Sequence, residues 1–138
     1  MREIRFRAWD KERGYFHWGA SNICLTLGGN LMWQFGWEFP NLLDREEASN
    51  YILMQYTGLK DKNGKEIYEG DILKYTVDDN STETGTERIN KVVFHEGAFC
   101  YIVPVLIMGE LPSFLCQYNK QSEIIGNAYE NPELLKDD

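Results

Sequence analysis

Two histidines and a few acidic side chains near turns are the residues of this chain that could carry out acid–base chemistry. Glu69 and Asp71 are separated by one glycine, and paired carboxylates can act as general acid and base. His95 precedes a glutamate at an expected hairpin tip, whereas the HExxH zinc motif needs both histidines on one helix. His17 lies far from His95, and no adjacent nucleophile completes a set. One hypothesis is therefore a small hydrolase or nuclease that uses scattered carboxylates and His95, and the alternative is that these groups are simply exposed in turns.

The sequence predicts no cofactor and no metal centre. The three cysteines, Cys24, Cys100 and Cys116, form no CxxC pair and no zinc-ligand spacing. Neither a Walker loop nor a GxGxxG segment is present, so nucleotide binding has no support. The odd number and low density of cysteines fit reduced thiols in a cytosolic protein. Cys100 lies between aromatic residues and is expected to be a small buried hydrophobic side chain.

The chain is acidic overall but begins with a basic segment. Its net charge is −8, whereas residues 1–13 hold five Lys or Arg against three Asp or Glu. Nucleic acids and anionic membranes attract clustered basic side chains, so neither is expected as a partner. Arg5 and Arg7 could bind the acidic surface of a second copy, and the alternative is a solvated strand face. No signal peptide is expected, and the longest apolar run, residues 98–108, is too short to span a bilayer.

An aromatic stripe follows at residues 31–39. Leu31, Trp33, Phe35, Trp37 and Phe39 alternate with other residues, which places them on one face of a strand. No Lys or Arg occurs between positions 14 and 44. Aromatic, charge-poor surfaces are typical of interface centres, so Trp33, Phe35, Trp37 and Phe39 are candidates for self-association. A buried core and a surface on which a ligand stacks are the two alternatives.

Many short strands with closely spaced turns predict a mainly β fold. The spacing of hairpins in residues 51–138 predicts a small SH3-like or related β-barrel with a C-terminal helical turn. Residues 1–50 are predicted to form a β-rich N-terminal portion. One short helix is expected within 41–50. Between the strands, Asp61 and Gly64 close one turn, and Gly126 predicts a bulge. The expected strands are 2–9, 15–18, 23–27, 31–39, 51–57, 67–68, 72–77, 88–94, 98–107, 113–118 and 123–129.

Three segments carry a resemblance to a known family. The sequence of residues 2–10, REIRFRAWD, is one segment; the run from Leu53 to Leu73, with turns at Gly58, Gly64 and Gly70, is the second; residues 124–135, IIGNAYENPELL, are the third. Together they resemble the opening, central and closing motifs of the YopX proteins, which are found mainly in bacteriophages and prophages. The resemblance implies a protein of a bacterial host cell, and it supplies no catalytic residue to transfer.

Three functions are compatible with these patterns. The first is a non-enzymatic binding or assembly module that forms homo-oligomers in the bacterial cytoplasm, with a host or phage protein as a further partner. The second is an acidic decoy that binds a host nucleic-acid-binding protein by imitating phosphate spacing, which the net charge suggests. The third is the small hydrolase described above. The sequence favours the first because the groups that could do chemistry form no complete set.

Overall fold

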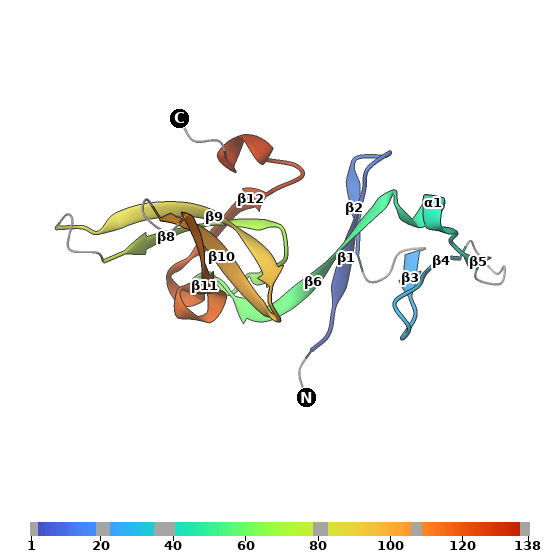
Figure 1. The fold of residues 1–138 in the computed structure, drawn as a ribbon, viewed down its shortest axis with the longest axis horizontal. Helices are drawn as coiled ribbons and strands as arrows, with labels where there is room; N and C mark the ends of the chain where they lie inside the picture. The colour runs from blue at the N-terminus through green and yellow to red at the C-terminus, as the bar shows by residue number, and fades with distance from the viewer. Residues whose placement is uncertain (1–2, 19–22, 35–40, 79–82, 106–108, 136–138) are drawn as a thin grey trace. The chain divides into compact units, whose positions relative to one another are not determined.

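The computed structural model describes residues 3–18, 23–34, 41–78, 83–105 and 109–135 of the 138-residue chain (Figure 1). The chain divides into two compact units. We call Ile4–Gln55 the N-terminal unit, and Tyr56–Asp138 with Met1–Glu3 the C-terminal unit. The chain passes from the first to the second within strand β6 (Tyr51–Lys60). Whether the two portions predicted from the sequence, 1–50 and 51–138, are separate domains stays a prediction.

The main sheet of the N-terminal unit is antiparallel. Its central strand β1 (Phe6–Asp10) pairs with β2 (Tyr15–His17) on one side and with the first half of β6 on the other. Trp9 lies opposite Phe16 in the register, and Ala8 lies opposite His17. Because side chains alternate along a strand, these two pairs point to opposite faces of the sheet. One face is therefore aromatic, and the other carries the polar residues discussed below.

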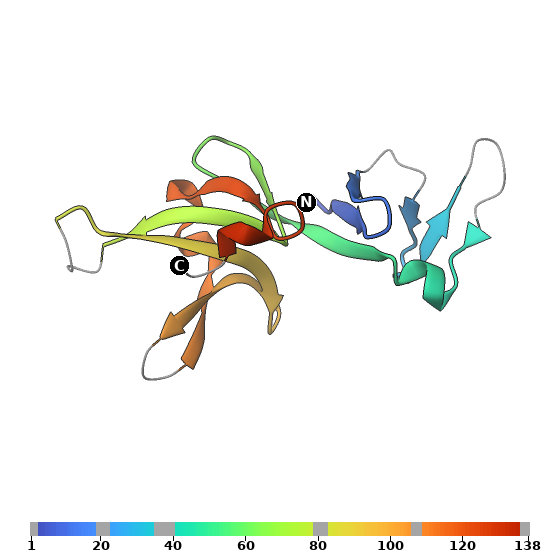
Figure 2. The same cartoon turned by 90° about the horizontal axis from the view of Figure 1, so that it is seen from above.

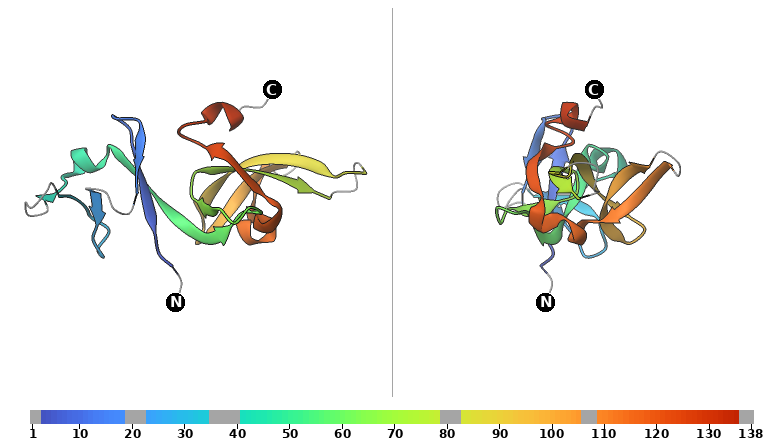
Figure 3. Two further views of the ribbon diagram at one scale, coloured as in Figure 1. Left: turned by 180° about the vertical axis from the view of Figure 1, so that it is seen from behind. Right: turned by 90° about the vertical axis from the view of Figure 1, so that its left-hand side faces the viewer.

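A second, smaller sheet and a short helix complete the N-terminal unit. The sheet has the order β3 (Ile23–Leu25), β4 (Leu31–Trp33) and β5 (Asn41–Leu42), and the helix is α1 (Arg45–Ala48). Asp44 caps this helix, because its Oδ1 accepts a hydrogen bond from the Glu47 backbone N–H at 2.8 Å. The short helix predicted within residues 41–50 is confirmed. Figures 1 and 3 show the small sheet and α1 on the same side of the β1–β2 hairpin.

The C-terminal unit is built around a five-stranded antiparallel sheet with the order β11-β10-β9-β8-β12. The sheet curls into a half-barrel, as Figures 2 and 3 show. The predicted class, a mainly β fold with a small barrel and short helices, is confirmed. The elements of this unit after β6 are β7 (Glu66–Tyr68), β8 (Asp71–Val77), β9 (Thr86–His95), β10 (Ala98–Val105), β11 (Gly109–Phe114), η1 (Leu115–Gln117), η2 (Asn119–Gln121), β12 (Glu123–Asn127) and η3 (Pro132–Leu135).

Buried tyrosines and aliphatic side chains form the core of the C-terminal unit. The Tyr75 and Tyr101 rings stack with their centroids 4.7 Å apart. The Tyr101 hydroxyl lies 3.1 Å from Ser122 Oγ, so the buried phenol keeps a polar partner. Burial of each large side chain contributes about 2 kcal/mol, so this cluster holds the curled sheet together. Its buried members are Ile67, Leu73, Tyr75, Val92, Tyr101 and Leu115.

The strand predicted for residues 113–118 is wrong beyond Phe114. The chain instead turns through η1, where the Tyr118 N–H donates to the Leu115 carbonyl at 3.1 Å. Leu115 is fully buried in the core, and Asn119, four residues later, is also buried. Asn119 Nδ2 donates to the Lys60 carbonyl at 2.8 Å. The burial of Leu115 and Asn119 is a tertiary effect, so packing overrides the strand-like composition of this segment.

The bulge predicted at Gly126 is confirmed. The pairing of β12 with β8 shifts register between Ile124 and Gly126. A Cβ atom at position 126 would lie 2.6 Å from Asn131 Oδ1, so only glycine fits without displacing that side chain. Asn131 Oδ1 in turn accepts a hydrogen bond from the Asn127 N–H at 3.3 Å. The bulge therefore lets the closing segment fold back on β12.

The turn that follows β6 depends on one buried carboxylate. Asp61 is 6% exposed, and its Oδ1 accepts from the N–H groups of Asn63 and Lys65, both at 2.9 Å. Its Oδ2 accepts from the Ile124 N–H at 3.1 Å, which connects the turn to β12. Gly64 has φ of 80°, as the predicted turn requires. Asp61 thus closes a local turn and also holds two distant segments together.

Replacing Asp61 with alanine is expected to lower the free energy of unfolding of the C-terminal unit by about 3 kcal/mol, because three backbone N–H groups lose a charged acceptor. Lys62→Ala is the matched control. Lys62 makes an ion pair of 3.5 Å with Glu123, but both side chains are almost half exposed. Its loss should cost less than about 1 kcal/mol. Urea unfolding followed by circular dichroism measures both, and equal losses would contradict this role for Asp61.

Candidate functional site

The buried carboxylate of Asp10 is the centre of the polar face of the N-terminal unit. Asp10 closes β1 and is 1% exposed. Its Oδ1 accepts hydrogen bonds from the Arg13 backbone N–H at 3.0 Å and from Asn50 Nδ2 at 2.9 Å. Its Oδ2 lies 3.0 Å from His17 Nε2. One side chain therefore joins the β1–β2 turn, β2 and the residue that precedes β6.

These partners keep Asp10 ionised. Burial by itself would raise the pKa of the Asp10 carboxyl, but the hydrogen bonds from the Arg13 N–H, His17 and Asn50 outweigh it and hold the pKa below its ordinary value of 3.8. An ionised carboxylate only accepts hydrogen bonds, so His17 Nε2 carries the proton in this contact. Asp10 thereby fixes both the orientation and the protonated nitrogen of the His17 ring.

Aromatic rings enclose the other sides of His17. Its ring centroid lies 5.7 Å from that of Tyr51 and 6.4 Å from that of Trp33, both in edge-on arrangements, and 5.0 Å from Tyr15. The His17 side chain is only 9% exposed. In a catalytic Asp–His pair the second ring nitrogen meets a nucleophile, whereas here the neighbours of the His17 ring are the Tyr15, Trp33 and Tyr51 rings. The geometry fits a pair that positions neighbouring side chains.

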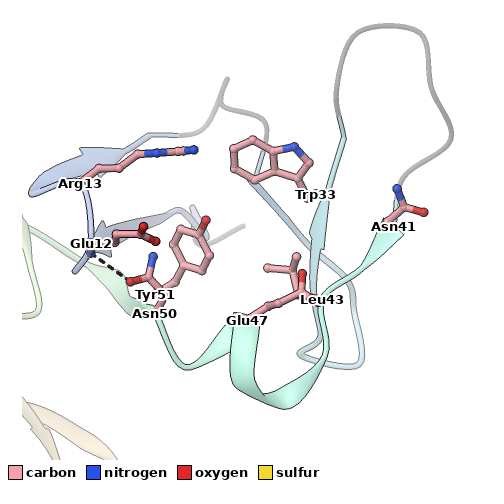
Figure 4. Close-up of a pocket in the computed structure, with 8 residues that line it drawn as sticks. All are labelled: Glu12, Arg13, Trp33, Asn41, Leu43, Glu47, Asn50 and Tyr51. Carbon is pink, nitrogen blue, oxygen red and sulfur yellow. Dashed lines mark hydrogen bonds between the residues drawn. The ribbon is translucent and has the colours of Figure 1, made fainter.

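Beside this pair lies a pocket of about 390 Å³, which Figure 4 shows. The Arg13 guanidinium lies over the Trp33 ring, 5.6 Å from its centroid. The Glu12 N–H donates to Asn50 Oδ1 at 3.0 Å, so Asn50 connects the pocket wall to Asp10. The lining consists of two aromatic rings, two carboxylates, two amides, one guanidinium and one aliphatic side chain: Trp33, Tyr51, Glu12, Glu47, Asn41, Asn50, Arg13 and Leu43.

Of the aromatic stripe predicted as an interface, Trp33 is the member that the structure describes. It lies in β4 and lines the pocket. Phe35, Trp37 and Phe39 lie outside the described residues. An interface role for these four side chains stays a prediction.

The two arginines predicted for an interface lie in different surroundings. Arg5 is exposed, whereas Arg7 is 5% exposed and so is not on a solvated strand face. The Arg7 guanidinium lies over the Phe16 ring at 4.5 Å and over the Trp18 ring at 5.6 Å. We call Trp9, Phe16 and Trp18 the aromatic ladder, because successive ring centroids are 4.9 and 5.9 Å apart. An interface role for either arginine stays a prediction.

Of the groups first considered for acid–base chemistry, Glu69, Asp71 and His95 lie in the C-terminal unit, and His17 lies in the N-terminal unit. Asp71 is buried, and its Oδ2 accepts from the Tyr68 N–H at 2.8 Å, which closes the turn at Gly70. His95 is 45% exposed, and its Nε2 lies 3.9 Å from Glu96. Within the described ranges, no three His, Cys, Asp or Glu side chains are grouped so that they could hold a metal ion. Among the same residues, no helix is long and apolar enough to cross a membrane.

Sequence reasoning missed the Asp10–His17 pair. The two residues are seven apart, and they meet because the turn at residues 11–14 folds β2 back along β1. The sequence held a signal for this pair. Asp10 ends an alternating strand, and a short turn follows it. In such a hairpin, a residue of the return strand lies diagonally opposite the Asp. The exposure of each side chain, which decides the importance of the pair, depends on β4 and β6 and is not visible in the hairpin sequence.

Replacing Asp10 with asparagine is expected to destabilise the N-terminal unit by about 3 kcal/mol at neutral pH, because a buried charged acceptor is lost. All four tryptophans fall within Ile4–Gln55, so tryptophan fluorescence during urea unfolding reports on this unit. Glu12→Gln is the control, since it removes the same charge from an exposed position two residues away. Equal midpoints for the two variants would rule out a central role for Asp10.

The same variant tests the pH dependence of stability. The folded carboxyl has the lower pKa, so its ionisation stabilises the unit at pH values above the ordinary pKa and this contribution disappears as pH falls through the folded pKa. The difference in free energy of unfolding between the parent protein and Asp10→Asn should therefore shrink from pH 5 down through the acid range, a window on the order of two pH units. A difference that stays constant over that window would contradict the assignment.

Comparisons with known proteins place these features in a family. The family model described as YopX protein matches residues 5–136. The crystal structure of protein EF1440 from Enterococcus faecalis is similar, with a TM-score of 0.58 and 25% identity, over 99% of this chain and 100% of that chain. The X-ray structure of yopX from Bacillus subtilis has the same fold, with a TM-score of 0.56 and 23% identity over the same shares. No curated protein matches the chain. The match along almost the whole sequence shows that this chain belongs to the YopX family.

Proposed function

We propose that the protein is a non-enzymatic binding and assembly module that forms homo-oligomers through its N-terminal unit, in the cytoplasm of a phage-infected or lysogenic bacterium. The observation that carries the proposal is the aromatic ladder. Trp18, its last ring, is 51% exposed, and the Arg7 guanidinium lies over it. Tryptophan and arginine are the residues that contribute most often to the centres of protein interfaces. An exposed tryptophan supported from beneath by a buried arginine and Phe16 is a rigid anchor of this type.

Charge complementarity supports a second copy as the partner. Residues 1–13 carry a net charge of +2, while the chain as a whole carries −8, so the rest of each copy is strongly acidic. Arg5 is exposed on this basic segment. When two copies meet, a basic segment of one and the acidic surface of the other attract each other. The aromatic ladder then supplies the apolar anchor, and the charges supply orientation.

The proposal predicts a mass well above that of the 16.1 kDa subunit in sedimentation or light scattering at micromolar concentration. Trp18→Ser should shift the protein toward the monomer, because the exposed ring of the ladder is lost. Leu27→Ser is the matched control, since Leu27 is fully exposed in the same unit and belongs to no ring cluster. Its mass distribution should equal that of the parent protein.

Raising the salt concentration should weaken association of the parent protein, because contacts between exposed charges are screened. Two outcomes would contradict the proposal. One is a parent protein with the monomer mass at every concentration. The other is an equal shift toward monomer for Trp18→Ser and Leu27→Ser, which would point to general loss of apolar surface and not to the ladder.

A further inference from the structure

We propose that the pocket beside the Asp10–His17 pair binds the guanidinium group of an arginine side chain from a partner peptide. This inference does not depend on self-association, since the pocket lies on the polar face of the β1–β2 sheet and the aromatic ladder lies on the other face. Its volume of about 390 Å³ is within the range of pockets that bind small groups. The argument rests on the two kinds of wall that the pocket presents.

The first kind of wall is aromatic. Trp33 and Tyr51 both line the pocket. A guanidinium already lies on the Trp33 ring, since the Arg13 carbon Cζ is 5.6 Å from the ring centroid. Cations are attracted to the face of an aromatic ring, and tryptophan is the best of these rings. The contact between Arg13 and Trp33 is therefore of the same kind as the contact that an incoming arginine would make.

The resident arginine has contacts of its own that an incoming guanidinium must replace. The Arg13 side chain is 52% exposed, and its Nη1 lies 3.8 Å from Asp10 Oδ2, which is a long ion pair. Asp10 in this pair is buried, and the Arg13 side chain also hydrogen-bonds Tyr15. An incoming guanidinium therefore competes with the half-exposed Arg13 side chain for the Trp33 ring. The Arg13 backbone N–H bonds to Asp10 whatever the side chain does.

The second kind of wall is anionic. Glu12 lies in the β1–β2 turn and Glu47 lies on α1, so carboxylates approach the pocket from two elements (Figure 4). The hydrogen bond and negative charge of neighbouring Asp44 raise the pKa of Glu47, which indicates an excess of negative charge around this carboxyl. An arriving cation relieves this repulsion, whereas an anion would increase it.

The combination of the two walls selects the ligand class. Two carboxylates against one arginine give the lining a net charge of −1, so phosphate or another anion is disfavoured. A neutral planar ring could stack on Trp33, but it would leave both carboxylates without a counter-charge. A guanidinium satisfies both walls, because its face stacks on the indole while its edge donates to carboxylates. Arginine is therefore the side chain whose chemistry fits this pocket.

Isothermal titration calorimetry with the full chain tests the proposal. The probe is the capped peptide Gly-Gly-Arg-Gly-Gly, and the matched probe replaces arginine with citrulline, which has the same shape but no charge. The arginine peptide should bind about tenfold more tightly, because citrulline loses both the cation–π contact and the ion pairs. Free arginine amide is a third probe. Equal binding of arginine amide and peptide would assign the site to a free cation and overturn the choice of a peptide partner.

Four variants locate the binding. Trp33→Ala should abolish it, and Glu47→Gln should weaken it by about fivefold. Glu46→Gln is the control, because Glu46 is exposed on the same helix turn but does not line the pocket. Arg13→Ala should tighten binding by about threefold, since the resident guanidinium no longer competes. Tryptophan fluorescence during urea unfolding verifies that each variant is folded.

Three results would overturn the inference. They are equal affinity for the arginine and citrulline peptides, equal effects of the Glu46 and Glu47 substitutions, and no binding by either the parent protein or Arg13→Ala at millimolar peptide. A monomeric protein that passes these tests would reject self-association and leave the pocket assignment standing. An oligomer that fails them would do the reverse.

Discussion

The carboxylate of Asp10 is the constraint on which the N-terminal unit depends. Among the described residues of this unit, Ala8 and Met54 are the hydrophobic side chains that are buried. Aliphatic packing therefore contributes little, and the unit relies on ring contacts and on the polar contacts of Asp10. These contacts set the positions of the β1–β2 turn, His17 and Asn50. A buried charge with three hydrogen-bonding partners is stable only in one arrangement, which gives a small unit a defined geometry.

The C-terminal unit owes its defined geometry mainly to an apolar core. Stacked tyrosines and aliphatic side chains fill its curled sheet, and Asp61 joins its first turn to its last strand. The two units thus differ in what they present. The C-terminal unit buries Tyr75 and Tyr101 in its core, although Phe94 and Phe114 are exposed, whereas the N-terminal unit leaves Trp18 half exposed and borders a pocket with Trp33. The two recognition surfaces proposed above both lie in the N-terminal unit.

Local signals in the sequence were sufficient for the fold class and for most strands and turns. The positive φ of Gly64 and the bulge at Gly126 could be predicted from the sequence, because both depend on the local backbone conformations that glycine allows. The 3₁₀ turn after Phe114 was missed because the burial of Leu115 and Asn119 is a tertiary effect. The pocket was missed for a related reason. Its lining comes from the β1–β2 turn, β4, β5 and the residue after it, α1, and the start of β6 with the residue before it, and no sequence pattern shows that these segments meet.

The ionisation of Asp10 in solution is the most direct test of this account. Nuclear magnetic resonance with ¹³C-labelled aspartate follows the Asp10 carboxyl as pH falls, while the ring signals of His17 report on its partner. The account predicts a midpoint below the ordinary value of 3.8, with the His17 ring signals changing over the same interval. A carboxyl that titrates at its ordinary value while the His17 ring signals stay constant would contradict it.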